Sequence, residues 1–255
     1  MKALAGRHAL VTGANRGIGA ATARALSEAG AAVTLMVRDR LAARPVADAL
    51  GLNQTIVTAD VTVAAAVHEA CGEAAALLGP IHILVNNAGT AESAPFLKTA
   101  PELFERMFAV HLLGAVHATQ AVLPGMIERG HGHVVNVASM AGIRGEAYVT
   151  AYVAAKHALV GLTRALALEV GRRGVAVSAV CPGYTETDLV HRAVARIVAK
   201  TGHTAAEALR TILAGAGQTR LITAEEVARA VLALVSAPDG DQMGQIVVLD
   251  GSSGS

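Results

Sequence analysis

Short apolar segments alternate with longer helix-like segments along the whole chain, and this alternation is the feature that most constrains the fold. Strands that alternate with helices of about 10–15 residues indicate βαβ units and a parallel sheet. The expected strands are apolar on both faces, as strands are when helices cover both sides of a sheet. They are residues 8–12, 32–37, 55–59, 81–85, 133–138, 175–180 and 246–249. The expected helices are residues 19–29, 64–78, 103–129, 151–172 and 224–236. The pattern predicts an α/β fold of three layers with a doubly wound parallel sheet.

One stretch breaks the alternation. Residues 184–221 are rich in Thr, Ala and Gly and contain helical stretches but no strand-like run. We expect a small helical insertion there that covers the substrate as a lid. The chain shows no internal repeat with a period of about 20–50 residues and no low-complexity linker. We therefore expect a single domain over residues 1–255.

Charge and composition argue against several classes of partner. The net charge is +1 with neutral histidines, so nothing favours nucleic acid or an anionic membrane. Cys71 and Cys181 lie far apart and match no metal spacing, so we expect reduced thiols in the cytoplasm and no metal site. Residues 1–8 lack the apolar run of a signal peptide, and charges or glycines interrupt each apolar run before the ~18 residues of a membrane span. We expect a cytoplasmic protein whose partner is a small molecule.

The first expected strand runs directly into a glycine-rich turn, T-G-A-N-R-G-I-G at residues 12–19, and a helix follows. Gly13, Gly17 and Gly19 let the backbone turn tightly and approach a pyrophosphate. The N-terminus of the helix adds free N–H groups and a partial positive charge. A glycine turn can also be purely structural, but its place between the first strand and the first helix favours a dinucleotide site.

The spacing of these glycines, G-x-x-x-G-x-G, resembles that of the short-chain dehydrogenase/reductase family, whose members carry T-G-x-x-x-G-x-G. Further family motifs follow in the family's order over almost the whole chain. They are Asp60 after the third strand, N-N-A-G at residues 86–89, Ser139, Tyr152, Lys156, Pro182-Gly183 and Asp250-Gly251. The resemblance implies a Rossmann fold and an enzyme that transfers a hydride between a nicotinamide dinucleotide and a carbonyl/alcohol pair.

The choice of dinucleotide is decided at the end of the second strand, where NAD enzymes carry a carboxylate for the adenosine ribose. The equivalent residue here is Val37, and the next is Arg38, whose guanidinium can pair with the 2′-phosphate of NADP. Arg16 in the glycine turn is a second cation directed at the same region. We therefore expect NADP(H) to be favoured over NAD(H). The alternative is that Arg38 and Arg40 are solvated and that Asp39 binds the ribose. By the resemblance and this argument, the expected cofactor contacts are Gly13, Asn15, Arg16, Gly17, Ile18, Gly19, Arg38, Asp60, Val61, Asn87, Ala88, Gly89, Tyr152, Lys156, Pro182, Gly183, Thr185 and Thr187.

Tyr152 and Lys156 are four residues apart on an expected helix, which places both side chains on one face. A tyrosine pKa of about 10 is too high for a base near neutral pH, and we expect the Lys156 ammonium and an oxidised nicotinamide to lower it. Ser139 follows the fifth strand at the edge where open α/β sheets bind ligands, so its hydroxyl can donate to a substrate carbonyl. The expected catalytic set is Ser139 to orient the carbonyl, Tyr152 as general acid/base and Lys156 to tune Tyr152. By the resemblance, Lys156 also binds the nicotinamide ribose.

The chain departs from the family pattern at His111. The family usually has V-N-x-x-G on the long helix before the fifth strand, and residues 110–114 here read V-H-L-L-G. The usual asparagine is thought to hold a water in a proton relay to the lysine. An imidazole can also bind a water, and its ordinary pKa of about 6.5 suits proton transfer. The alternative is that His111 packs against the helix and that the relay is absent or takes another route.

The substrate side is expected in residues 140–147 and in the insertion that begins at Tyr184. The expected apolar walls are Met140, Ile143, Tyr148, Tyr184 and Leu189. Four charged residues are either polar contacts or charges on the rim, and the rim is the default: Arg144, Glu146, Glu186 and Asp188. The segment 181–188 with the insertion behind it resembles that of reductases acting on 3-oxoacyl thioesters, polyketides and other bulky ketones, which suggests an apolar ketone substrate.

Two other functions stay open at this stage. One is a dehydrogenase of 3-hydroxyacyl thioesters or secondary alcohols that works in the oxidative direction. The other is a regulator that binds the dinucleotide without catalysis, although such proteins usually lose the tyrosine or the lysine. The long helices 103–129 and 151–172 resemble the family's dimer-forming pair, which implies a homotetramer or a dimer.

Overall fold

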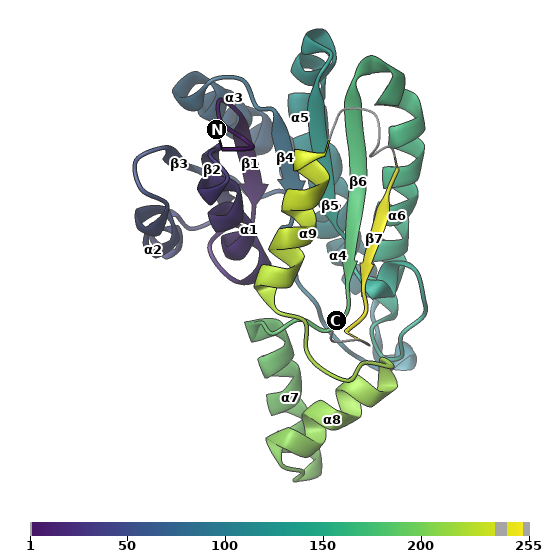
Figure 1. Cartoon of the computed structure of the whole chain (residues 1–255). Coiled ribbons are helices and arrows are strands. Elements are labelled where there is room, and N and C mark those ends of the chain that lie inside the picture. Colours follow the sequence, from purple (N-terminus) through teal and green to yellow (C-terminus); the bar gives the residue numbers. More distant parts are fainter. Residues whose placement is uncertain (1, 238–243, 252–255) are drawn as a thin grey trace.

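The computed structural model describes residues 2–237 and 244–251, and the side chains of Leu189 and Arg192 lie outside the described part. The expected contact of Leu189 with substrate therefore lies outside it too. The described residues form a sheet of seven parallel strands in the order β3-β2-β1-β4-β5-β6-β7 (Figure 1). The strands are β1 (His8–Thr12), β2 (Ala32–Val37), β3 (Gln54–Thr58), β4 (Ile83–Asn86), β5 (Gly132–Val137), β6 (Val175–Pro182) and β7 (Ile246–Leu249). The predicted doubly wound α/β fold is confirmed.

The strand order reverses between β1 and β4, which are neighbours in the sheet although β2 and β3 lie between them in the sequence. Each strand lies where the apolar pattern predicts it, with shifts of one or two residues at some ends. The largest extension is at β6, which continues to Pro182 because Cys181 and Pro182 pair with Val248 and Leu249 of β7. This extension carries the backbone as far as the Pro182-Gly183 turn expected to contact the cofactor.

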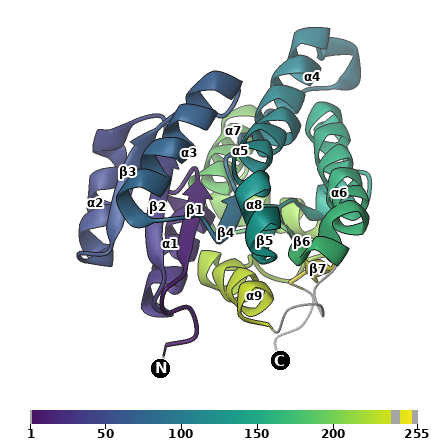
Figure 2. The ribbon, with the colours of Figure 1, turned by 90° about the horizontal axis from the view of Figure 1, so that it is seen from above.

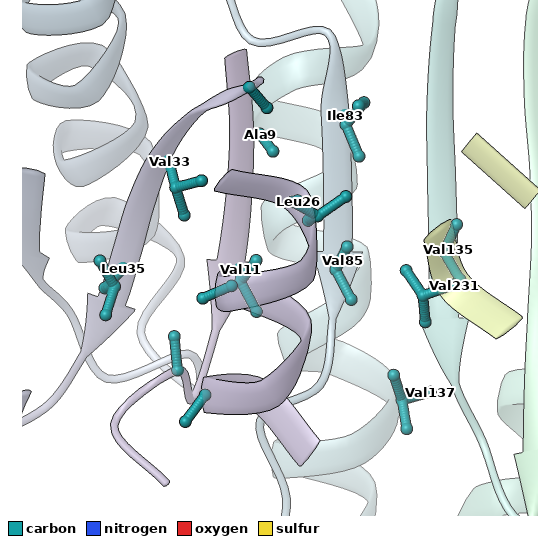
Figure 3. Packing of buried hydrophobic residues seen from close by; sticks show 14 of the residues in the cluster. Ala9, Val11, Leu26, Val33, Leu35, Ile83, Val85, Val135, Val137 and Val231 are labelled. Atoms are coloured by element: carbon teal, nitrogen blue, oxygen red, sulfur yellow. The ribbon is translucent and has the colours of Figure 1, made fainter. Parts of the chain in front are cut away.

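Helices cover both faces of the sheet (Figure 2). One face is covered by α1 (Gly17–Glu28), α2 (Arg40–Leu50) and α9 (Ala224–Ser236). The other is covered by α3 (Ala64–Leu78), α5 (Gly114–Arg129) and α6 (Thr150–Val170). Figure 3 shows the first layer, in which Leu26 of α1 and Val231 of α9 pack over strand residues such as Val11, Val85 and Val135. Each fully buried side chain of this size contributes about 1.5–3 kcal/mol.

Helix α2 is absent from the sequence prediction. Pro45 lies inside it and normally breaks a helix, which weakened the helical pattern. The signal that could have found it is Asp39, which precedes the helix and caps it. The Asp39 carboxylate accepts hydrogen bonds from the backbone N–H groups of Leu41 and Ala42, at 2.9 and 3.2 Å.

The single long helix predicted over residues 103–129 is divided. It consists of α4 (Pro101–Phe108), a π-helical turn at Ala109–Leu113 and α5. The π turn contains His111 and buries it, and such turns are frequent at functional sites.

By length and composition alone, Pro101–Arg129 is apolar enough to cross a membrane, contrary to the expectation that charges or glycines interrupt every such run. Its α5 part buries Ala118, Val122 and Met126 against the sheet. It is therefore a helix of the core.

The insertion at residues 184–221 is helical, as predicted. Its helices are α7 (Asp188–Thr201) and α8 (Ala205–Gly215). Figure 1 shows both of them beyond the carboxyl ends of the strands, at the end of the molecule where α/β sheets bind ligands.

His8 is buried at the start of β1, with 1% of its surface exposed. Its Nδ1 lies 2.7 Å from the carbonyl oxygen of Gly79 and its Nε2 lies 2.8 Å from the hydroxyl of Thr34. The backbone N–H of His8 donates to Nδ1 of His82 at 3.0 Å, so that ring nitrogen carries no proton. Burial lowers the pKa of His8 and lowers the pKa of His82 to about 4.

We expect acid to destabilise the protein through these histidines. Below about pH 6.5 the unfolded chain binds more protons at these histidines than the folded chain does, because their pKa values are lowered in the folded chain, so the free energy of unfolding falls as the pH falls. The fall is at most about 1.4 kcal/mol per pH unit for each histidine. Urea unfolding at pH 7.5, 6.5, 5.8 and 5.0 measures this slope. His8→Gln should flatten the slope, and an unchanged slope in that variant would contradict the assignment.

Candidate active site

The glycine turn is closely packed against the end of β4. Gly13 has a φ of +66°, and a Cβ atom there would lie 2.9 Å from the Cα of Ala88. A Cβ atom at Gly19 would lie 2.5 Å from both the Nδ2 of Asn87 and the carbonyl oxygen of Gly13. Neither position can carry a side chain without a shift of the backbone or of Asn87. The turn therefore exposes bare backbone at the carboxyl edge of the sheet.

Hydrogen bonds through Thr12 and Asn87 join the turn to β4. The Thr12 hydroxyl accepts from the backbone N–H groups of Asn87 and Ala88, at 2.9 and 3.0 Å. The Asn87 amide nitrogen donates to the carbonyl oxygens of Thr12 and Gly13, at 2.9 and 3.2 Å. The predicted Gly13, Asn87, Ala88 and Gly19 are thus brought together.

The N-terminus of α1 suits an anion. Arg16 stands at the N-cap and makes no side-chain capping bond, and the first turn contains no acidic residue. The first N–H groups of the helix are therefore not capped by the Arg16 side chain, and the helix dipole favours a negative group there. Thr187 of the insertion faces the same turn, because a Cβ atom at Gly17 would lie 3.4 Å from its methyl carbon. These residues fit the pyrophosphate of a dinucleotide.

Asp60 and Arg38 meet at the end of β3. One Asp60 oxygen accepts from the backbone N–H and the hydroxyl of Thr62, at 2.9 and 2.7 Å, and these bonds lower the pKa of the carboxyl. The other Asp60 oxygen lies 3.9 Å from the Arg38 guanidinium, whose side chain is 79% exposed. Asp39 is engaged as the cap of α2. Arg38 is therefore placed at the expected adenosine end, and capping competes with the alternative role of Asp39 as a ribose ligand.

Other predicted cofactor contacts surround this turn. Arg16 lies 3.7 Å from Asp188 of α7, so its charge faces the insertion as well as the turn. Ile18 packs on the core, and Val61 and Thr185 are buried. The carbonyl oxygen of Gly183 accepts a hydrogen bond from the Thr185 hydroxyl at 3.1 Å. Because Gly183 has no side chain, the Gln218 side chain can pack against it.

The predicted catalytic residues come together from two elements. Ser139 lies two residues beyond the end of β5, and Tyr152 and Lys156 lie one turn apart on α6. The Ser139 side chain accepts from the backbone N–H of Ala141 at 3.1 Å, and it acts on Tyr152 by lowering the pKa of its hydroxyl. The Lys156 ammonium donates to the carbonyl oxygen of Val137 at 2.8 Å and lies 5.6 Å from the centre of the Tyr152 ring. Ser139, Tyr152 and Lys156 thus form one cluster at the carboxyl edge of the sheet.

Burial shifts the pKa values of this cluster differently from the sequence expectation. Burial raises the pKa of Tyr152 to about 12, the Ser139 hydrogen bond lowers it, and the charge of Glu146 raises it further. Burial also lowers the pKa of Lys156 to about 8. The expected lowering of the tyrosine pKa is therefore wrong for the chain by itself, because the loss of solvation is the largest influence on Tyr152 and raises its pKa.

His111 is buried beneath Tyr152, with the two ring centres 5.1 Å apart and the rings nearly perpendicular. Its Nε2 lies 2.7 Å from the carbonyl oxygen of Thr90, while its Nδ1 is buried without a hydrogen-bond partner. Burial, followed by the charge of Lys156, lowers the pKa of His111 to about 3. The expectation of an ordinary histidine pKa is wrong. The ring is neutral. The shorter contact of Nε2, 2.7 Å to the Thr90 carbonyl oxygen against 3.4 Å to the Thr90 N–H, assigns the ring proton to Nε2 and leaves Nδ1 as an acceptor.

A small cavity lies between His111 and the catalytic lysine. Its lining includes His111, Lys156, Asn86 and Val61. Two of these residues carry buried acceptors without a partner, Nδ1 of His111 and Oδ1 of Asn86. A polar cavity of this kind suits a single bound water.

On the substrate side, the residues expected to form an apolar wall differ in their exposure. Ile143 and Tyr148 are exposed, and Tyr148 has a φ of +67°. The Tyr184 hydroxyl instead donates to the Glu146 carboxylate. Gln218 was not among the predicted site residues, but it is a buried amide whose Oε1 accepts from the Tyr184 backbone N–H at 2.7 Å. A lone glutamine in a helical insertion gives no sequence signal for such a role.

Two further expectations concerned the cysteines, expected to be reduced thiols, and metal ions, for which no site was expected. Cys71 and Cys181 are free and buried thiols. In the residues that the structure describes, no group of three or more His, Cys, Asp or Glu side chains could hold a metal ion.

Comparisons with known proteins agree with this geometry. The family model described as short chain dehydrogenase matches residues 7–198. The D-beta-hydroxybutyrate dehydrogenase of Rhizobium meliloti (strain 1021) is 34% identical over 251 residues, which cover 95% of this chain and 96% of that protein. A putative ketoacyl reductase of Streptomyces coelicolor is 38% identical over 186 residues, 71% of either chain. The inactive 2-(S)-hydroxypropyl-CoM dehydrogenase 2 of Xanthobacter autotrophicus is 37% identical over 229 residues, 90% of this chain and 97% of that protein.

Proposed function

The chain belongs to the short-chain dehydrogenase family, whose oxidoreductases act on hydroxy or keto substrates, and we propose that it is an NADP(H)-preferring reductase of ketones. The observation that carries this proposal is the cluster of Ser139, Tyr152 and Lys156, in which the Lys156 ammonium lies 5.6 Å from the centre of the Tyr152 ring and Ser139 lowers the Tyr152 pKa. This cluster lies at the same edge of the sheet as the glycine turn. The proposed substrate class is a 3-oxoacyl thioester, a polyketide or another bulky apolar ketone.

The roles of the three side chains follow from their chemistry. The bound nicotinamide ring supplies or takes up the hydride. The substrate carbonyl oxygen accepts hydrogen bonds from Ser139 and Tyr152, and Ser139 stabilises the charge that develops on that oxygen. Tyr152 then gives its hydroxyl proton to it. Since the pKa of Tyr152 is raised to about 12, the phenol is protonated at neutral pH and ready to donate. This protonation state suits ketone reduction.

Two alternatives have specific support. The similarity to a protein named as a hydroxybutyrate dehydrogenase favours the oxidative direction, in which a 3-hydroxyacyl thioester or another secondary alcohol is the substrate. The similarity to a protein named as inactive supports the second alternative, a regulator that binds the dinucleotide without catalysis. The complete Ser139, Tyr152 and Lys156 set argues for catalysis. Cofactor absorbance at 340 nm with a panel of ketones and alcohols separates these functions.

We also propose that the protein is cytoplasmic and that it forms a homotetramer or a homodimer. The helices expected to form the contact expose large apolar side chains, with Leu168 of α6 86% exposed and Leu113 of the π turn 45% exposed. Such exposed apolar surface is typical of a face that associates.

Tyr152→Phe should abolish turnover. The change removes the proton donor and keeps the ring, so kcat should fall by at least about 10²-fold. Dinucleotide affinity, measured by quenching of cofactor fluorescence, should change little. Substantial residual turnover in the variant would refute the role of Tyr152.

Arg38→Ala should raise KM for NADPH about 10-fold or more, because a charge-assisted hydrogen bond to the 2′-phosphate contributes about 1.5–3 kcal/mol. KM for NADH should change less than about twofold, since that cofactor lacks the phosphate. Arg40→Ala is the matched control, because Arg40 lies 3.7 Å from Glu73 on α3 and away from Asp60. A wild-type enzyme that clearly prefers NADH would contradict the proposed cofactor.

His111 is proposed to hold a water through its Nδ1 and so to connect Lys156 to a proton relay. His111→Asn should then keep most of kcat, since an amide oxygen can accept from the same water. His111→Leu should lower kcat about 10²-fold, the low end of the contribution of positioned proton transfer. Steady-state kinetics from pH 6 to 9 with both variants measures this. Equal activity of the leucine variant over that range would favour plain packing of the ring.

A further inference from the structure

Glu146 and Tyr184 form a polar pair on the substrate side of the catalytic tyrosine. Glu146 lies between the 3₁₀ turn at Met140–Gly142 and α6, a few residues before Tyr152. Tyr184 lies two residues beyond the end of β6. The Tyr184 hydroxyl donates to one oxygen of the Glu146 carboxylate. Neither residue has a role in the proposed reaction.

The backbone of Tyr184 is hydrogen-bonded to residues at the end of the insertion and just after it. Its N–H donates to Oε1 of Gln218 at 2.7 Å, and its carbonyl oxygen accepts from the backbone N–H of Ile222 at 3.0 Å. Gln218 is buried, and its Nε2 also donates to the Tyr184 carbonyl oxygen at 3.4 Å. The tyrosine ring is therefore anchored at the base of the insertion, and it holds Glu146 at the site.

The negative charge of Glu146 acts on the reacting hydroxyl. It raises the pKa of Tyr152, after burial, and it also raises the pKa of Tyr184. The cation on the same segment, Arg144, donates to the carbonyl oxygen of Ala216 at the end of α8 and acts on Tyr184. Glu146 therefore gives the substrate side of Tyr152 a negative field.

We propose that Glu146, held by Tyr184, makes this site select carbonyl substrates whose acyl end is uncharged, an ester or a thioester, against the same substrates as free carboxylates. In a 3-oxo acid the carboxylate lies only two bonds from the carbonyl carbon, so it must enter the field that Glu146 creates. Like charges repel, and the repulsion grows as water is excluded from between them. The inference rests on the proposed ketone reduction and narrows its substrate class.

The test compares ethyl 3-oxobutyrate with 3-oxobutyrate as substrates of the full-length protein, with NADPH and with NADH. The wild type should favour the ester by about 10-fold or more in kcat/KM. Glu146→Gln should bring this ratio towards unity, mainly through a lower KM for the free acid. Tyr184→Phe keeps the charge and should keep part of the ratio. Glu128→Gln, an exposed carboxylate at the far end of α5, is the matched control and should leave the ratio unchanged.

A second readout separates an electrostatic role from a merely structural one. Removal of the Glu146 charge should lower the pKa of Tyr152, so the rise of alcohol oxidation with pH should move to lower pH in Glu146→Gln. Glu146→Ala serves the same comparison if the glutamine variant does not fold.

The outcomes decide the inference. A wild type that uses the free acid as well as the ester overturns it, and so does a Glu146→Gln variant that loses both activities in equal proportion without a shift of the pH profile. Absence of turnover with every ketone and alcohol, in a protein that still binds the dinucleotide, overturns the proposed ketone reduction and the inference with it. A tenfold ratio that Glu146→Gln removes supports it.

Discussion

The site depends on the place where β1 and β4 run side by side. There the order of the strands reverses, and the connections leave the sheet in opposite directions and open its carboxyl edge. The Thr12 hydroxyl bridges this edge by accepting two backbone N–H groups from residues 87 and 88. Since a buried N–H without a partner costs about 1–3 kcal/mol, this hydroxyl holds the glycine turn against the N-N-A-G segment. The closeness of Gly13 to Ala88 follows from it, and only a glycine fits there.

A second set of buried hydrogen bonds connects the sheet to the catalytic helix. The amide nitrogen of Asn86 donates to the Asn136 amide oxygen at 2.9 Å, from β4 to β5. The amide nitrogen of Asn136 donates to the Thr163 hydroxyl of α6 at 2.8 Å, and that hydroxyl donates to the carbonyl oxygen of Leu159. Buried polar groups that are satisfied in this way specify one arrangement of their elements. They fix the position of α6 along β5, and therefore the distance from Ser139 to Tyr152.

The fold and the grouping of Ser139, Tyr152 and Lys156 could be predicted because they depend on local patterns. Apolar runs mark each strand, and Tyr152 and Lys156 share a helix face at a spacing visible in the sequence. Helix α2 was missed because Pro45 masks a helix that the Asp39 cap starts. The pairing of Tyr184 with Glu146 and the bonds of Gln218 could not be predicted, since they join residues 38 and 34 positions apart through tertiary packing. The pKa of His111 was misjudged for the same reason, because its burial comes from the π turn and from Tyr152.

Burial also changes how the two catalytic groups of α6 work together. It raises the pKa of Tyr152 to about 12 and lowers that of Lys156 to about 8, so the lysine is the stronger acid of the two. Once Tyr152 has given its proton to a substrate oxygen, the phenolate can be reprotonated from Lys156 with a favourable driving force. The cavity beside Lys156, with its acceptors on His111 and Asn86, lies where a water could return the proton to the lysine. In the proposed reaction, the direction of this transfer from Lys156 to Tyr152 suits ketone reduction.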